Sequence, residues 1–225
     1  MLQERPANNF GIAFILATLI AIGTGILILA LGKNGSFQLI NSNHNEIADQ
    51  VFKYFTHYGD GLMWVPLGIY CFFYRRKYFI AVVAAVIIST IFAQFLKRVI
   101  YPDELRPISY LSEIFPVHVV EGVTMRKVHS FPSGHTTTAF AMALIMAYII
   151  NRKAWSVILP LLASLAGYSR VYLAQHFPTD IFAGMCIGVV SAILSLMIYK
   201  SFNKHFNKRV NHPKPQMPSS ARVNL

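Results

Sequence analysis

Three short stretches of the sequence combine residue types that could bind and transfer a charged group. They are Lys97-Arg98 with Arg106-Pro107, then Pro132-Ser133-Gly134-His135, and finally Ser169-Arg170 with His176 and Asp180. Each lies at or near the end of an apolar run, where ionisable side chains are costly to place and seldom lack a role. Together they would supply cations, two histidines and a carboxylate to one site.

The second stretch has the composition of an anion-binding helix start. Ser133 is a favourable N-cap residue for the apolar run that follows it. The backbone N–H groups of residues 133–135 would then point out of the helix, and Gly134 lacks the Cβ that would keep an oxyanion away. Unpaired amides at the positive end of a helix dipole suit a phosphate. His135 would lie in the first turn, beside that anion.

The third stretch can form an oriented nucleophile. Asp180 follows His176 by four residues, and helix side chains lean toward the N-terminus, so the carboxylate can accept a hydrogen bond from the N–H of one imidazole nitrogen. The other nitrogen is then left as a nucleophile. A metal site that uses His176 and Asp180 is the alternative, but no further histidine or carboxylate cluster completes it.

Cations from two stretches complete the predicted site. Lys97, Arg106 and Arg170, with the helix N-terminus, fit a doubly charged phosphoryl group. They would also oppose the charge that develops on its equatorial oxygens during transfer.

The composition indicates a membrane protein that must position these groups. Only 13% of residues are charged, against about 25% in soluble domains, while 55% are hydrophobic and the mean hydropathy is +0.48. These values argue against a disordered chain, a nucleic-acid-binding module and an ordinary cytosolic enzyme, although the net charge is +11. Cys71 and Cys186 fall inside apolar runs, so a disulfide framework is not expected.

Six apolar runs predict six transmembrane helices. The runs are continuous, whereas a lipid-facing β-barrel would show alternation. They predict an all-α bundle, and the second run is expected to begin a turn early, near Thr56. The runs cover residues 10–31, 61–74, 78–96, 133–150, 154–173 and 181–199.

The positions of lysine and arginine predict the orientation. Twelve of the 20 lie at the termini and in the loops near residues 75–77 and 152–153, with Glu4 as the only acid on that side. Cation-rich short loops stay in the cytoplasm. We therefore expect a plasma (inner) membrane protein with both termini cytosolic and its active site facing outward, toward the periplasm. The expected division is a cytosolic segment 1–9, a six-span domain 10–199 and a basic, disordered cytosolic tail 200–225.

Two connecting segments on the predicted outer side could shape the site. Asn43, with Glu46 three residues later, reads as a helix cap before the apolar residues Ile47, Val51 and Phe55. This pattern favours a short helix on the outer membrane surface, and a plain loop is the alternative. The long 97–132 loop carries His118 and His129 and is typical of a lid or binding element; two ordinary surface histidines are the alternative.

The three stretches resemble the signature of the type 2 phosphatidic acid phosphatase family, which includes lipid diphosphate phosphatases and, more distantly, soluble vanadium haloperoxidases. Pro132-Ser133-Gly134-His135 and the spacing S-R-x5-H-x3-D from Ser169 to Asp180 carry the resemblance. One departure concerns the family's first motif, usually K-x6-R-P. Eight residues separate Lys97 from Arg106 and seven separate Arg98 from it, so either cation could reach the phosphate, with Lys97 modestly favoured.

The resemblance implies a role for each residue. His176 would attack phosphorus to form a phosphohistidine, Asp180 would orient it, and His135 would protonate the departing oxygen and later activate water. The implied phosphate-binding residues are Lys97, Arg106, Ser133, Gly134 and Arg170. No metal or cofactor is implied.

The expected function is hydrolysis of a lipid phosphate or diphosphate of the undecaprenyl diphosphate, phosphatidylglycerophosphate, phosphatidate or lipid A phosphate class. The expected partners are the lipid substrate and the bilayer, without nucleic acid or an obligate protein partner. A lipid-linked phosphotransferase is the nearest alternative. A transporter using Arg170, His176 and Asp180 as an ion relay is another, but it would predict broken helices near mid-membrane, whereas these residues cluster at one surface.

Overall fold

The computed structural model describes residues 8–211, and the regular structure of this part is entirely helical, with no β-strand. The predicted all-α fold is therefore confirmed. Two 3-10 turns, η1 (Thr56–Gly59) and η2 (Gly61–Met63), precede α3, and a π-helical turn, η3 (Leu96–Ile100), follows α4. The α-helices are α1 (Asn8–Asn41), α2 (Glu46–Phe55), α3 (Trp64–Tyr74), α4 (Arg76–Phe95), α5 (Pro107–Leu111), α6 (Gly134–Ile150), α7 (Lys153–Tyr172) and α8 (Pro178–Asn211).

Six apolar helices lie where the sequence places them, but they differ in length. Four described segments are long and apolar enough to cross a membrane: Asn9–Asn41, Arg76–Ile100, Lys153–Tyr172 and Pro178–His205. The other two, Gly61–Tyr74 and Gly134–Ile150, are shorter apolar helices. A crossing by all six stays a prediction.

Two helices extend past the predicted runs. α1 continues beyond residue 31 to Asn41 across a kink at Gly32, whose φ of 70° is readily adopted by glycine. α8 continues past Tyr199 to Asn211, so residues 200–211 are helical rather than part of a disordered tail. Hydropathy reports where a chain meets lipid, and a helix can continue into water beyond that point. The rest of the predicted tail, 212–225, and residues 1–7 lie outside the described residues.

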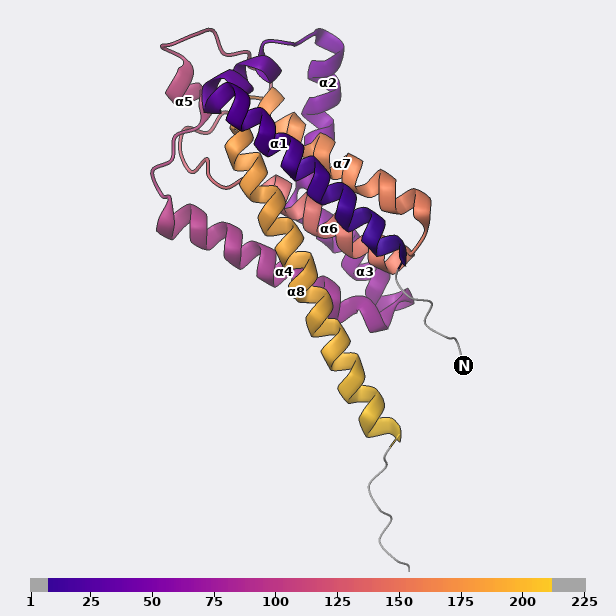
Figure 1. Cartoon of the computed structure of the whole chain (residues 1–225). Coiled ribbons are helices and arrows are strands. Elements are labelled where there is room, and N and C mark those ends of the chain that lie inside the picture. Colours follow the sequence, from indigo (N-terminus) through magenta and orange to yellow (C-terminus); the bar gives the residue numbers. More distant parts are fainter. Residues whose placement is uncertain (1–7, 212–225) are drawn as a thin grey trace, which may run out of the picture.

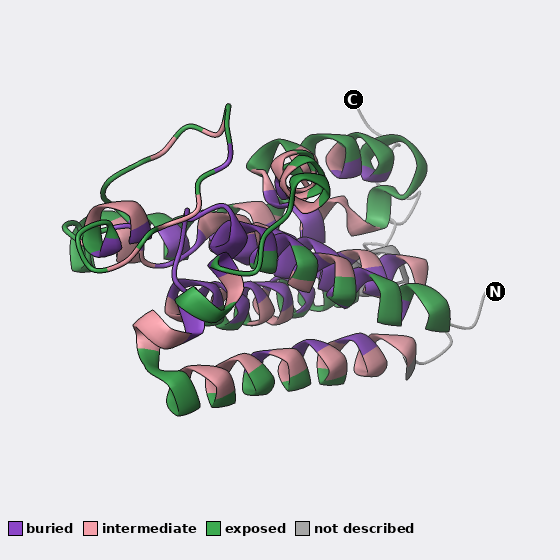
Figure 2. Cartoon of the chain, turned by 90° about the horizontal axis from the view of Figure 1, so that it is seen from above, coloured by how far each residue is buried: buried purple, intermediate pink, exposed green. Residues whose placement is uncertain are grey.

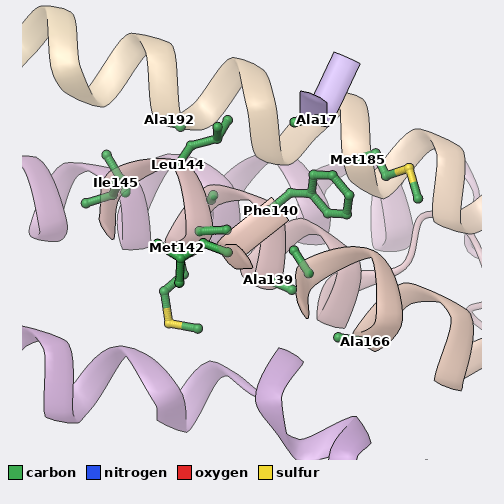
Figure 3. Close-up of a cluster of buried hydrophobic side chains, with 14 of the residues drawn as sticks. Ala17, Ala139, Phe140, Met142, Leu144, Ile145, Ala166, Met185 and Ala192 are labelled. Atoms are coloured by element: carbon green, nitrogen blue, oxygen red, sulfur yellow. The ribbon is translucent and has the colours of Figure 1, made fainter. Parts of the chain in front are cut away.

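α6 forms the centre of the bundle. Figure 1 shows it among α1, α7 and α8, with α4 crossing beside it, and α6 contacts all four helices. Its buried residues continue almost without a break from Ala139 to Ala147. Figure 2 shows the burial concentrated on the inner faces of the bundle and exposure on the outer faces. Figure 3 shows Phe140 and Leu144 of α6 beside Met185 and Ala192 of α8.

Glycines on α8 hold the start of α6 close. A Cβ at Gly184 would lie 2.7 Å from the Ser133 carbonyl oxygen, and one at Gly188 would lie 2.7 Å from the Thr137 carbonyl oxygen. Small residues four apart let two helix backbones approach in a membrane bundle. The N-terminus of α6 is therefore fixed against the start of α8, which carries Asp180.

α2 confirms the predicted short helix and corrects its cap. The N-cap is Asn45, whose side-chain oxygen accepts a hydrogen bond from the Ala48 N–H at 2.9 Å. Asn43 instead donates to the Leu39 carbonyl at the end of α1, so the proposed Asn43 cap is wrong. The helix exposes Ile47 and Val51. A position on the outer membrane surface stays a prediction.

Candidate active site

The nucleophile predicted from the third stretch is held as expected. The Nδ1 atom of His176 lies 3.2 Å from Oδ2 of Asp180, and both residues are buried. The same oxygen accepts hydrogen bonds from the Phe177 N–H at 2.9 Å and from the Ser130 hydroxyl. The Phe177 and Ser130 contacts fix the carboxylate, which in turn fixes the imidazole. His176 lines a cavity, whereas Asp180 lies behind it.

The protonation state of His176 suits a nucleophile. Burial and the charges of Arg106, Lys97 and Arg170 hold the pKa of His176 well below its ordinary value of 6.5. A lowered pKa favours the neutral ring, so a nitrogen lone pair is available at neutral pH. Binding of a phosphate dianion would offset part of this positive field.

The start of α6 has some, but not all, of the features of the predicted anion-binding site. The Ser133 hydroxyl oxygen accepts hydrogen bonds from the Thr136 N–H and hydroxyl, and the Ser133 N–H donates to the Asp180 carbonyl at 3.0 Å. Ser133 is buried and caps the helix, so it does not line the cavity. Gly134 and His135 do line it, and their N–H groups have no acceptor among the described residues. A Cβ at Gly134 would meet no protein atom within 4 Å, so it would project into space that an anion could use.

Arg170 carries an unsatisfied donor. Its Nη1 donates to the Thr56 hydroxyl at 2.8 Å and its Nη2 contacts Oε1 of Gln175 at 3.4 Å. The Nε atom is buried and has no partner in the described part of the chain. Leaving a buried charged donor unpaired is costly. A bound phosphate oxygen would satisfy it.

Arg106 is largely occupied by the protein. It donates to the carbonyls of Gln175 at 2.8 Å, Val128 at 3.1 Å and His129 at 3.3 Å. Burial and the charge of Arg126 lower the pKa of Arg106 to about 10, so it remains charged at neutral pH. Arg106 therefore holds the segment 127–129 against the site and contributes charge, with few N–H groups left for a ligand.

One cationic cavity of about 1090 Å³ is lined by Arg106, Gly134, His135, Arg170 and His176. Its lining includes seven lysines and arginines and a single acid, Asp60. An uncompensated cluster of this kind favours a multiply charged anion. No group of three or more His, Cys, Asp or Glu side chains that could hold a metal ion occurs within residues 8–211.

The π-helical turn accounts for part of the unusual spacing before Arg106. The Tyr101 N–H bonds to the Leu96 carbonyl, so the turn encloses one residue more than an α-helical turn. Lys97 is half-buried and within electrostatic reach of Arg106, Asp180 and Arg170.

Arg98 is exposed and bonds to Gln94 at 2.9 Å. We therefore expect Lys97→Ala to lower kcat/KM by about 10²-fold, as for loss of one oxyanion-binding donor, and Arg98→Ala by less than about threefold, as for an exposed charge. Phosphate release from a lipid phosphate measures both, and the reverse order would assign phosphate binding to Arg98.

Sequence reasoning missed Gln175, Arg126, Ser130 and Thr56. Gln175 is 3% exposed; its side-chain oxygen faces both Arg106 and Arg170, and its amide nitrogen donates to the Thr124 carbonyl. Arg126 is exposed and acts electrostatically on Lys97, Arg106 and Arg170. The only available signal for Gln175 was its position directly before His176.

The side-chain oxygen of Gln175 lies between the guanidinium groups of Arg106 and Arg170. Gln175→Leu removes the oxygen between the two guanidinium groups, so we expect kcat/KM to fall by roughly tenfold, the cost of one hydrogen bond to a charged group. Gln94→Leu is the matched control, because Gln94 also lines the cavity but accepts its hydrogen bond from the exposed Arg98, and it should change kcat/KM by less than about twofold. Equal effects of the two variants on phosphate release would contradict a positioning role for Gln175.

The part of the chain that carries the site matches a known protein family. The model of the PAP2 superfamily matches residues 64–204. The chain is 28% identical over 165 residues to the undecaprenyl-diphosphatase of Sulfolobus acidocaldarius, covering 72% of this chain and 76% of that one. It is 29% identical over 147 residues to the lipid A 4'-phosphatase of Porphyromonas gingivalis, covering 62% and 61%.

A solved structure agrees. The crystal structure of Aquifex aeolicus LpxE is 32% identical and superposes with a TM-score of 0.64 over 72% of this chain and 92% of that one. The family match covers more than half of the sequence and includes all three polar stretches. The resemblance is thereby confirmed: the chain belongs to the PAP2 superfamily.

Proposed function

We propose that this protein is an integral-membrane lipid phosphatase that works through a phosphohistidine on His176. The observation that carries the proposal is the oriented His176 facing a cavity that also holds the unpaired Nε of Arg170 and the N–H groups of Gly134 and His135. Nucleophile and oxyanion donors thus converge where a phosphoryl group would sit.

The reaction has two steps. The free ring nitrogen of His176 attacks phosphorus, the bond from phosphorus to the lipid oxygen breaks, and His135 gives that oxygen a proton. His135 then removes a proton from water, whose oxygen attacks phosphorus and breaks the phosphorus–nitrogen bond. Inorganic phosphate leaves and both histidines return to their starting state. Lys97, Arg106 and Arg170 oppose the charge on the equatorial oxygens, and no step is assigned to a metal or cofactor.

The relatives and the fold support the proposed substrate class. Relatives named as undecaprenyl-diphosphatase, lipid A phosphatase and phosphatidylglycerophosphatase support a lipid phosphate or diphosphate. The clustering of polar residues at one end of the bundle favours a phosphatase over an ion relay along the membrane. Transfer to an acceptor other than water is the enzymatic alternative.

The test is phosphate release by the purified protein in detergent with a chelator present. The panel contains undecaprenyl diphosphate, phosphatidylglycerophosphate, phosphatidate and a lipid A phosphate. We expect release from at least one member, and an acid-labile, alkali-stable phosphoprotein on rapid quenching. No release from any member would refute the proposal, and transfer to an added alcohol with no hydrolysis would identify a phosphotransferase.

The proposed orientation is tested by labelling. In a protein lacking Cys71 and Cys186, we expect Glu113→Cys, exposed between α5 and α6, to react with an impermeant maleimide in intact cells. Arg152→Cys, exposed between α6 and α7, should react only after permeabilisation, because cation-rich loops stay in the cytoplasm. The opposite pattern would place the active site in the cytosol.

A further inference from the structure

A second, apolar groove of about 370 Å³ lies between α3 and α6. Tyr58, Met63 and Tyr70 line one side, and Met142, Met146 and Ile149 line the other. Met142 belongs to the buried core, and Figure 3 shows its side chain pointing to the side opposite Phe140, Leu144 and Met185. Apart from two tyrosine hydroxyls, this lining offers only hydrocarbon and thioether groups.

The groove runs along the bundle. One side of the groove follows the two 3-10 turns and α3 from Tyr58 to Tyr70, and the other extends seven residues along α6, roughly 10 Å at about 1.5 Å per helical residue. On α6, Met142, Met146 and Ile149 recur every three or four residues and so lie on one face. This shape suits an extended chain better than a compact ligand. Methionine side chains adapt to irregular partners.

The end of the groove that is lined by Tyr58 adjoins the catalytic cavity. Tyr58 belongs to η1, in which Thr56 and His57 line the cationic cavity. The next residue, Gly59, approaches α6 so closely that a Cβ would lie 2.8 Å from the His135 carbonyl oxygen. The end of the groove is therefore one short turn from His135, the residue on the leaving-group side of the proposed reaction.

A buried polar atom marks this end. The Tyr58 hydroxyl oxygen is inaccessible and has no hydrogen-bond partner among the described residues. Leaving a buried hydroxyl without a hydrogen bond is unfavourable. An oxygen atom at the junction of a lipid head group and its chain could accept a hydrogen bond from this hydroxyl.

We propose that the groove between α3 and α6 binds the hydrocarbon chain of the substrate, with Tyr58 at the junction of chain and head group. The inference rests on the proposed phosphatase function and assigns a place to the leaving-group side of the lipid. A chain that comes from the bilayer gains little hydrophobic energy in the groove, because lipid tails are already apolar surroundings. The contribution is positional: a seated chain aligns the scissile bond with His176 and His135.

The experiment compares two alkyl phosphates of different length. Met63→Trp and Met146→Trp would fill the groove from opposite sides, and both residues are only half-buried. Misplacement of reacting groups by about 1 Å can cost 10²-fold. We expect kcat/KM for hexadecyl phosphate to fall at least about tenfold, while that for butyl phosphate, whose short chain can fill little of the groove, falls far less.

Met197→Trp is the matched control, because Met197 is 60% exposed on α8 and remote from the groove. It should leave both values unchanged. Equal losses on the two substrates in the groove variants would indicate general damage to the bundle, and no loss on either would show that ordinary membrane lipid fills the groove; both outcomes overturn the inference. Failure of the wild-type protein to hydrolyse either phosphate would instead refute the phosphatase function.

Discussion

His176→Ala is expected to abolish phosphate release. The side chain supplies the attacking nitrogen, and loss of a nucleophile costs up to about 10⁶-fold in other covalent hydrolases; a loss of at least about 10⁴-fold is expected here. Phosphate release and phosphoprotein formation should vanish together. Substantial activity in this variant would show that the reaction does not use a phosphohistidine at this position.

Asp180→Asn separates orientation from attack. Asp180 fixes the imidazole through one oxygen, which also receives the Phe177 N–H and the Ser130 hydroxyl. An amide oxygen can keep part of this set, so the loss should be less severe than in His176→Ala. His44→Ala is a matched histidine control, because His44 is exposed and stacks on His118 away from the cavity. Elution volume and detergent melting temperature establish that each variant is folded.

Much of the fold could be predicted because continuous apolar runs are a strong local signal. The predicted start of the fourth run at Ser133 coincides with the N-cap of α6, where a capping serine adjoins the run. The ends of α1 and α8 could not be predicted in this way, because polar residues continue a helix in water without changing hydropathy. The cap of α2 was placed two residues early because Asn43 and Asn45 are both capable, and only tertiary contacts decide between them.

In the candidate site, too, some contacts could be predicted from the sequence and others could not. His176 and Asp180 are only four residues apart, so their contact could be predicted from the sequence spacing. Other partners of the arginines are not local: Arg170 donates to Thr56 across 114 positions, and Arg106 donates to Gln175 across 69. A hydrogen bond between distant elements produces no periodic pattern in a single sequence. These residues could therefore be identified only in the structure.

The remaining prediction concerns His135 and the chemistry of the leaving group. His135 lines the cavity in the first turn of α6, and its backbone lies close to Gly59. A lipid monophosphate must expel an alkoxide, which is strongly basic and needs a proton as it leaves. A lipid diphosphate expels a phosphate, which departs readily without one. General acid catalysis contributes about 10²–10⁴-fold where the leaving group requires it.

We therefore expect His135→Ala to lower kcat for a monophosphate by about 10²-fold or more and kcat for a diphosphate far less. Single-turnover measurements remove any contribution of product release. His57→Ala is the matched control: this exposed histidine lines the same cavity and acts electrostatically on His135, so its loss should affect both substrates alike and weakly. Equal losses on the two substrates in His135→Ala would contradict an acid role, because removal of a phosphate-binding contact weakens the reaction whatever group departs.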